Sequence, residues 1–200
     1  RGRENYKYYQ RGELYLSEHA EMKLSAMEEA YMSRWIDQMP TMLGGGIIRG
    51  SQRAYTTYLN RIRADAFDVL LENLTRKETI TDVQLKAIGN GINVFTGRGN
   101  VKGMEKTMVG LNTIFFAPRL VMSRFQILLG QPMWKGTAQT RLLFAREYAR
   151  TLTAWGTLAT LANAAGAKIE TDPHSSDFGK IRIGQTRIDL MAGLSQNTVF

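Results

Sequence analysis

The chain has 200 residues with no cysteine, and its 26 Lys and Arg against 18 Asp and Glu give a net charge of +8. The absence of cysteine excludes disulfides and thiolate metal sites. The positive charge favours an anionic partner such as nucleic acid, or an anionic membrane surface. The remaining interpretation is a basic face that meets acidic neighbours in an assembly.

Apolar spacing and helix-end signals predict six helices along the chain. Pro40 and the glycines at 44–46 are typical of a flexible joint, and Ser51 is then the N-cap of the second helix. Thr81 and Gln84 form a capping box at the start of the third. Pro118 ends or kinks the fourth. The expected helices span residues 17–38, 51–74, 81–95, 102–117, 119–129 and 137–167.

Two of these helices carry readable side-chain patterns. In residues 51–74 a seven-residue repeat runs through Tyr55, Leu59, Ile62, Ala66, Val69 and Asn73. Arg61 and Asp65 are spaced for an ion pair across one helical turn. The helix over 81–95 is expected to carry Ile88, Ile92 and Phe95 inward.

The long helix that begins after Thr137 changes character halfway. Its first half is amphipathic, with Phe144 and Tyr148 on one stripe, whereas residues 151–167 hold no charge at all. A helix that is apolar all round must be enclosed by protein or by lipid. We expect enclosure by this chain's own helices, with Trp155 and Leu158 buried. A membrane span is the disfavoured alternative, because the stretch is shorter than ~20 residues and contains several Thr.

After Gly166 the period changes from that of a helix to that of strands. A short strand is expected at 168–170, and Gly184-Gln185 is typical of a two-residue type II′ hairpin loop between strands at 180–183 and 186–189. That loop predicts the pairs Ile181–Ile188, Arg182–Arg187, Ile183–Thr186 and Lys180–Asp189. Two facing arginines repel, so they should meet an anion or a carboxylate, for which Asp172 and Asp177 are the nearest candidates.

These elements predict a mainly α fold, a multi-helix domain with a C-terminal β-hairpin. The expected organisation is an N-terminal helical lead-in over 1–43, a helical core over 44–167 and a hairpin region over 168–200. Because the chain begins at Arg1 and stops at Phe200 within an apolar run, we expect one fragment of a longer polypeptide.

Catalytic and cofactor motifs are weak throughout. Residues 45–51 have the outline of a phosphate loop but lack its Lys, and His19 and His174 have no ligand-spaced partners. Residues 172–177 gather carboxylates and hydroxyls in a pattern typical of turns. Residues 96–100 indicate a glycine turn that ends a helix, with an anion-binding loop beside Arg98 as the alternative. We therefore predict no enzymatic activity, no catalytic residue, no metal and no cofactor.

Several arginines are spaced to neutralise phosphates without reading bases. The alternative for each is a solvated or salt-bridged helix face. The candidate nucleic-acid-binding residues are Arg49, Arg53, Arg141, Arg146, Arg150, Arg182 and Arg187.

Several segments, in their order along the chain, match a known pattern. The most specific is Ser175-Ser176-Asp177-Phe178-Gly179-Lys180-Ile181-Arg182, and the others lie at 51–55, 59–65, 96–99, 112–119 and 186–189. The series resembles a domain of the large polyvalent proteins of tailed bacteriophages and mobile elements. The similarity covers about residue 44 to residue 200, and the family's pattern continues beyond the hairpin.

The resemblance implies a segment of a long phage protein that is packaged in the virion and delivered into the host cell with the DNA. We expect a structural or interaction segment that packs against copies of itself or other virion proteins, close to non-specifically held DNA. One alternative is an accessory module that holds DNA for an enzyme elsewhere in the polypeptide. The other is a membrane-conduit segment of an ejection apparatus that uses residues 151–167.

Overall fold

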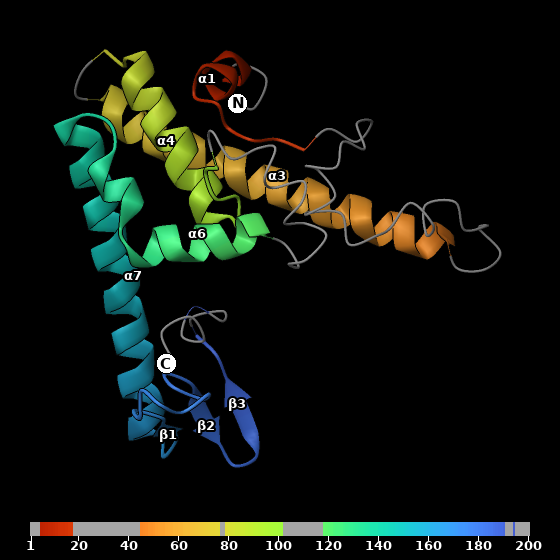
Figure 1. Cartoon of the computed structure of the whole chain (residues 1–200), viewed down its shortest axis with the longest axis vertical. Coiled ribbons are helices and arrows are strands. Elements are labelled where there is room, and N and C mark those ends of the chain that lie inside the picture. Colours follow the sequence, from red (N-terminus) through yellow and green to blue (C-terminus); the bar gives the residue numbers. More distant parts are fainter. Residues whose placement is uncertain (1–4, 18–44, 77–78, 102–117, 191–193, 195–200) are drawn as a thin grey trace.

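The computed structural model describes residues 5–17, 45–76, 79–101, 118–190 and 194, and the protein is mainly helical with a small sheet near its C-terminal end (Figure 1). The helices are α1 (Tyr6–Arg11), α3 (Gly45–Thr75), α4 (Asp82–Phe95), α6 (Pro118–Leu128), the 3-10 helix η2 (Gln131–Trp134) and α7 (Ala138–Ala164). The strands are β1 (Lys168–Ile169), β2 (Ile181–Ile183) and β3 (Thr186–Ile188). The helix predicted over 102–117, and all but the first residue of that predicted over 17–38, lie outside the described residues.

Helix α3 starts earlier than predicted. Gly45 and Gly46 are helical, so neither the flexible joint at these positions nor the phosphate-loop outline is correct, and Ser51 lies within the helix instead of capping it. Glycine lowers helix stability by about 1 kcal/mol relative to alanine, which the following turns of a long helix can absorb. The predicted Arg61–Asp65 ion pair forms, at 3.5 Å on the exposed surface.

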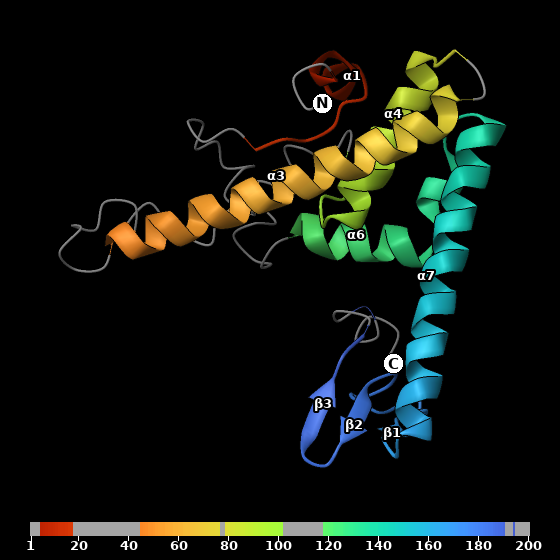
Figure 2. The ribbon, with the colours of Figure 1, turned by 180° about the vertical axis from the view of Figure 1, so that it is seen from behind.

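The buried face of α3 is not the seven-residue repeat. Tyr55 and Val69 of that repeat are about half exposed, at 49% and 57%. The buried face consists instead of Arg63, Phe67, Leu70, Leu71 and Leu74. This face is chosen by the elements that pack on it, because α4 and α7 contact α3 and α1 reaches its second half through Tyr9 (Figure 2).

Helix α4 lies at the centre of the helical body and contacts α1, α3, α6, η2 and α7. The predicted capping box is confirmed: Thr81 accepts a hydrogen bond from the Gln84 amide, and the Gln84 side chain accepts one from the Thr81 amide. Ile88 and Ile92 are buried as predicted. Phe95 is 41% exposed, although its ring stacks on Phe144 of α7.

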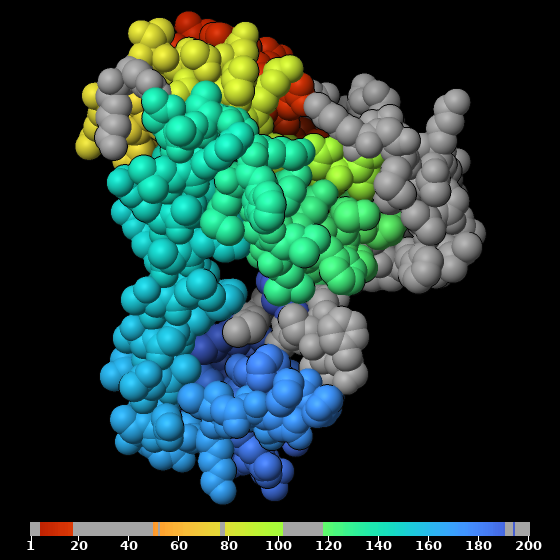
Figure 3. All heavy atoms as spheres, turned by 60° about the vertical axis from the view of Figure 1, so that its left-hand side comes forward, coloured from red at the N-terminus to blue at the C-terminus, as the bar shows by residue number. Residues whose placement is uncertain are grey.

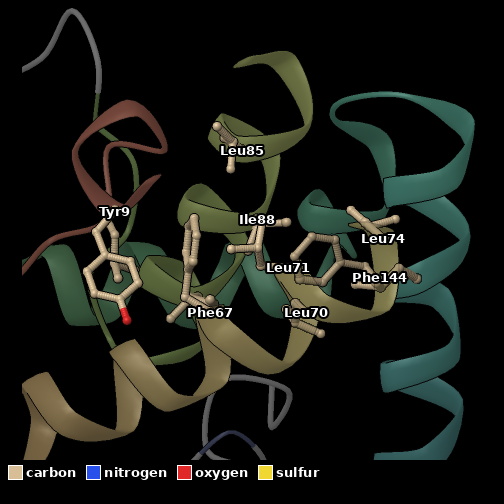
Figure 4. Close-up of a cluster of buried hydrophobic side chains, with 11 residues drawn as sticks. Tyr9, Phe67, Leu70, Leu71, Leu74, Leu85, Ile88 and Phe144 are labelled. Atoms are coloured by element: carbon tan, nitrogen blue, oxygen red, sulfur yellow. The ribbon is translucent and has the colours of Figure 1, made fainter. Parts of the chain in front are cut away.

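The core is a layer of apolar side chains between α4 and its neighbours (Figure 4). Phe67 from α3, Leu85 and Ile88 from α4, and Phe144 from α7 are almost completely buried in it. Helix α1 joins through Tyr9, which packs edge-on against Phe67 at 5.3 Å between ring centroids. The Tyr9 hydroxyl donates to Asp68 at 2.7 Å, and burial together with this carboxylate raises the pKa of Tyr9.

Helix α7 leaves the helical body and reaches the sheet (Figure 1). Thr137 caps it as predicted, accepting a hydrogen bond from the Thr140 amide. The antiparallel sheet has the order β1-β2-β3. The predicted pairs Ile181–Ile188, Arg182–Arg187 and Ile183–Thr186 are all present. Gly184 has φ +58° while Gln185 has no positive φ, as a type II′ loop requires.

Candidate functional site

The predicted nucleic-acid-binding arginines do not form one surface. The side chain of Arg49 lies outside the described part of the chain, and Arg53 is exposed on the half of α3 that points away from α7 (Figure 1). On α7, Arg141 and Arg146 are exposed, and Arg150 pairs with Glu147 at 2.5 Å. The hairpin carries Arg182 and Arg187. The set is therefore spread over α3, α7 and the hairpin.

One of the two facing arginines of the hairpin, Arg187, binds a carboxylate, and that carboxylate belongs to Asp177, one of the two predicted candidates. Arg187 forms an ion pair with Asp177, which also receives the Lys180 ammonium at 2.8 Å. Lys180 therefore binds Asp177, and the predicted Lys180–Asp189 pair is not part of the ladder. Arg182 donates instead to the Gly184 carbonyl at 3.2 Å. The hydrogen bond from Lys180, with the charge of Arg187, holds the pKa of Asp177 below its ordinary value.

Residues 172–177 form turns. Asp172 accepts a hydrogen bond from the His174 amide at 2.9 Å, and Ser175 accepts one from the Asp177 amide at 3.2 Å. The short side chains thus satisfy local backbone groups, which is the ordinary chemistry of such turns. Across the described ranges, no three His, Cys, Asp or Glu side chains gather closely enough to hold a metal ion.

The uncharged half of α7 is exposed, which corrects the prediction of burial. Leu152, Leu158 and Leu161 are 59%, 50% and 61% exposed, and Trp155 is only partly buried. The small sheet near the end of α7 covers too little of the helix to enclose it. Figure 3 shows this half of α7 as a column of atoms between the helical body and the sheet. Within the described residues, no helix is both long enough and apolar enough to cross a membrane.

Threonine side chains make this half of α7 less polar than its sequence suggests. The hydroxyl of Thr157 donates to the Thr153 carbonyl and that of Thr160 to the Gly156 carbonyl, each at 2.8 Å. Hydroxyls bonded within their own helix leave the methyl groups as the remaining side-chain surface. We call residues 151–165 the uncharged face; apart from Asn163, its exposed side chains are apolar or small.

A cleft of about 660 Å³ opens between α4, the segment after α1 and the residues that flank α6 and η2. Among the described residues, its charged lining side chains are Glu13, Lys86, Arg98, Arg119 and Lys135. Lys86 binds Glu13 at 2.9 Å. Arg98 is only 8% exposed, and its guanidinium lies 3.2 Å from the centroid of the Tyr15 ring. We refer to this space as the basic cleft.

The turn after α4 brings Arg98 into the cleft. Gly97 adopts φ +85°, and the Arg98 amide donates back to the Asn93 carbonyl at 2.8 Å. The Gly99 amide donates to the Arg119 carbonyl, which ties the start of α6 to the turn. Since the amides of residues 97–100 all donate to protein acceptors, the helix-ending turn is confirmed and the backbone is not an anion site. An anion here would be held by side chains.

No known protein family, curated protein or solved structure matches this chain. Of the residues that line the basic cleft, only Arg98 could be singled out from the sequence. Lys86, Arg119 and Lys135 come from separate elements, so their spacing along the chain does not predict that they line the same cleft. The glycine turn after α4 was the one local signal that pointed to this part of the molecule.

Proposed function

We propose that the chain is a non-enzymatic structural or interaction segment of a large bacteriophage virion protein. It packs against other virion proteins close to DNA during genome packaging or delivery, and it enters the host cell with the DNA. Residues 175–182 and the other matching segments resemble a domain of the large polyvalent phage proteins, which supports the phage assignment. The net charge of +8 suits a position near DNA.

The observation that carries the interaction role is the exposure of the uncharged face. Fully burying one leucine contributes about 1.5–3 kcal/mol, so Leu152, Leu158 and Leu161 represent substantial unused apolar surface. Leu158 and Leu161 lie three residues apart on one side of the helix, and exposed apolar side chains gathered there mark a surface that another protein covers.

A second copy of the chain is the partner that this face suits best. Residues 151–165 hold no charge, so two copies can meet without burying an unpaired ion. In such a dimer Leu158 and Leu161 of one copy pack against the same two residues of the other. A two-fold dimer uses the same patch from both subunits, and the helical part of the face is about 20 Å long at 1.5 Å per residue.

Sedimentation equilibrium of the Leu158→Glu/Leu161→Glu double variant tests this role. The wild-type chain should dimerise with increasing concentration, while the double variant should stay monomeric because each interface would bury unpaired carboxylates. Leu129→Glu, at a 71% exposed position just after α6, is the matched control and should dimerise normally. A wild-type chain that remains monomeric, or equal association of all three proteins, would contradict dimerisation through α7.

The virion assignment has a separate test. Purified particles of the phage that encodes the chain should yield its peptides by mass spectrometry, together with other internal proteins. Infected cells treated to block new protein synthesis should contain the same peptides after the particles have been removed. If no peptide of the chain is found in purified particles, the virion role is wrong, whereas the dimerisation result is unaffected.

A further inference from the structure

The basic cleft lies away from the uncharged face and has its own chemistry. Its described lining includes four cationic side chains, Lys86, Arg98, Arg119 and Lys135, and one carboxylate, Glu13. That carboxylate is already bonded to Lys86. Among the described lining side chains, cations therefore outnumber carboxylates, and an excess of one sign of charge in a cleft raises the local concentration of ligands of the opposite sign.

Arg98 is held in position before any ligand arrives. It is more than nine-tenths buried, and its guanidinium lies against the face of Tyr15. The Tyr15 amide is itself fixed by a hydrogen bond to the Asn93 side chain at 2.9 Å. A stacked guanidinium loses less side-chain freedom on binding an anion than a mobile one does, and its planar donors match phosphate oxygens.

Side-chain hydrogen bonds tie the cleft walls together around these cations. Asn100 donates to Asn90 at 2.9 Å, Asn90 donates to Gln131 at 3.1 Å, and Gln126 donates to the Asn100 carbonyl at 2.8 Å. This chain of carboxamides connects α4 with α6 and η2. It fixes the separation of the elements that carry Arg98, Arg119 and Lys135.

Gly136 places Lys135 beside α4. It adopts φ +80°, and a Cβ there would lie 2.6 Å from the Ala87 Cβ and 2.4 Å from the Thr140 hydroxyl. Only glycine fits both the conformation and the space, so η2 and the start of α7 approach the cleft as closely as the backbone allows. The position of Lys135 at the cleft thus follows from packing.

We propose that the basic cleft binds a phosphate-bearing ligand, with the phosphate held by Arg98, Arg119 and Lys135. Its volume of about 660 Å³ falls within the usual range for small-ligand sites, about 300–1,000 Å³. The phosphate is either that of a free nucleotide or a phosphodiester of single-stranded nucleic acid. Neither the phage assignment nor dimerisation through α7 is needed for this site.

Isothermal titration calorimetry at low salt tests the site with three probes: inorganic phosphate, AMP and a short oligothymidylate. Lys135→Gln and Arg119→Gln should each weaken binding of the preferred probe about tenfold, the effect of one charge-assisted hydrogen bond. Lys168→Gln removes the same charge from exposed β1, outside the cleft lining, and is the matched control. Thermal melts of every variant confirm that its fold is retained.

The probes also separate the two sources of phosphate. Tight AMP binding identifies a nucleotide site, whereas oligothymidylate binding with weak AMP binding identifies a nucleic-acid site. Either result supports phosphate binding in the basic cleft only if Lys135→Gln and Arg119→Gln reduce the affinity for the probe and Lys168→Gln does not. Equal reductions in all three variants would show general charge attraction, and no binding of any probe would equally overturn the proposal.

Discussion

Asp177 is the residue on which the hairpin's charge arrangement depends. The ladder places Arg182 opposite Arg187, and two facing cations weaken a strand pair. Asp177 offsets this by binding Arg187 and Lys180 together, while Arg182 turns to the loop carbonyl. Arg187 therefore acts as part of a local staple, and its contribution to nucleic-acid binding would require giving up its ion pair with Asp177.

The hairpin should weaken in acid. The pKa of Asp177 is lowered in the folded protein, so its contribution is present above the ordinary carboxyl range and is lost as pH falls through the folded pKa, below about pH 4. NMR shifts of residues 181–188, followed from pH 7 downward, should move toward unfolded values. Asp177→Asn should weaken the ladder at pH 7 and remove this part of the pH dependence.

Asp172→Asn is the control for that titration, because its side chain retains the oxygen that accepts from the His174 amide. It should leave the acid response of the ladder unchanged. A wild-type ladder that is unaffected down to about pH 2, well below the ordinary carboxyl pKa, or identical behaviour of the two variants, would show that Asp177 does not hold the hairpin.

Helix α4 can be central because two of its residues have no side chain. A Cβ on Gly89 would lie 1.9 Å from the Gly12 carbonyl oxygen, and one on Gly91 would lie 2.1 Å from the Phe144 ring. Glycine is a poor helix former, so the local cost is about 1 kcal/mol at each position. In exchange for this cost, α4 packs closely against the end of α1 at Gly89 and against α7 at Gly91.

Gly89→Ala should destabilise the protein even though alanine favours helix. The clash is with backbone, which cannot rotate away, so we expect the free energy of unfolding in urea to fall by about 1–3 kcal/mol. Gly156→Ala, on the exposed half of α7 with no atom within 4 Å, is the matched substitution. It should raise helix stability by about 0.5–1 kcal/mol. If both substitutions stabilise, α4 does not pack as closely as these distances require.

At the scale of the whole molecule, one exposed stretch of α7 carries no charge, whereas other parts of the chain carry exposed cations. Exposed arginines lie on α3, α7 and the hairpin, whereas residues 151–167 carry no charge. Scattered cations attract phosphates without reading sequence. This distribution suits loose, sequence-independent contact with DNA alongside a specific contact through α7.

Weak duplex DNA binding, independent of sequence and steeply dependent on salt, is the expected consequence. Replacing Arg141 and Arg146 with glutamine should lower the slope of log affinity against log salt by about 0.9 for each of these arginines that neutralises a phosphate. Arg76→Gln, whose guanidinium binds Glu72 at 2.7 Å, should change the slope less. Fluorescence anisotropy between about 50 and 200 mM salt measures the slope. An interaction insensitive to salt, or none at the lowest salt, would contradict direct DNA contact.

Features that depend on neighbouring residues could be read from the sequence alone. The Thr81–Gln84 capping box, the Thr137 cap and the hairpin register set by Gly184 are all present. Each rests on hydrogen bonds or backbone preferences spanning only a few positions, so the residues that cause it are adjacent in the chain. The mainly α fold with a C-terminal hairpin follows from the same local signals.

Burial and the meeting of distant residues were decided by tertiary structure. Residues 45–51 extend a helix where the glycines indicated a joint, and α3 buries Phe67 where the repeat pointed to Val69. Leu158 is exposed because no neighbouring element among the described residues covers that part of α7, which its uncharged composition does not reveal. Arg98, Arg119 and Lys135 line one cleft only because α4, α6 and η2 pack together. Packing partners choose a helix's buried face, and no spacing within one helix specifies them.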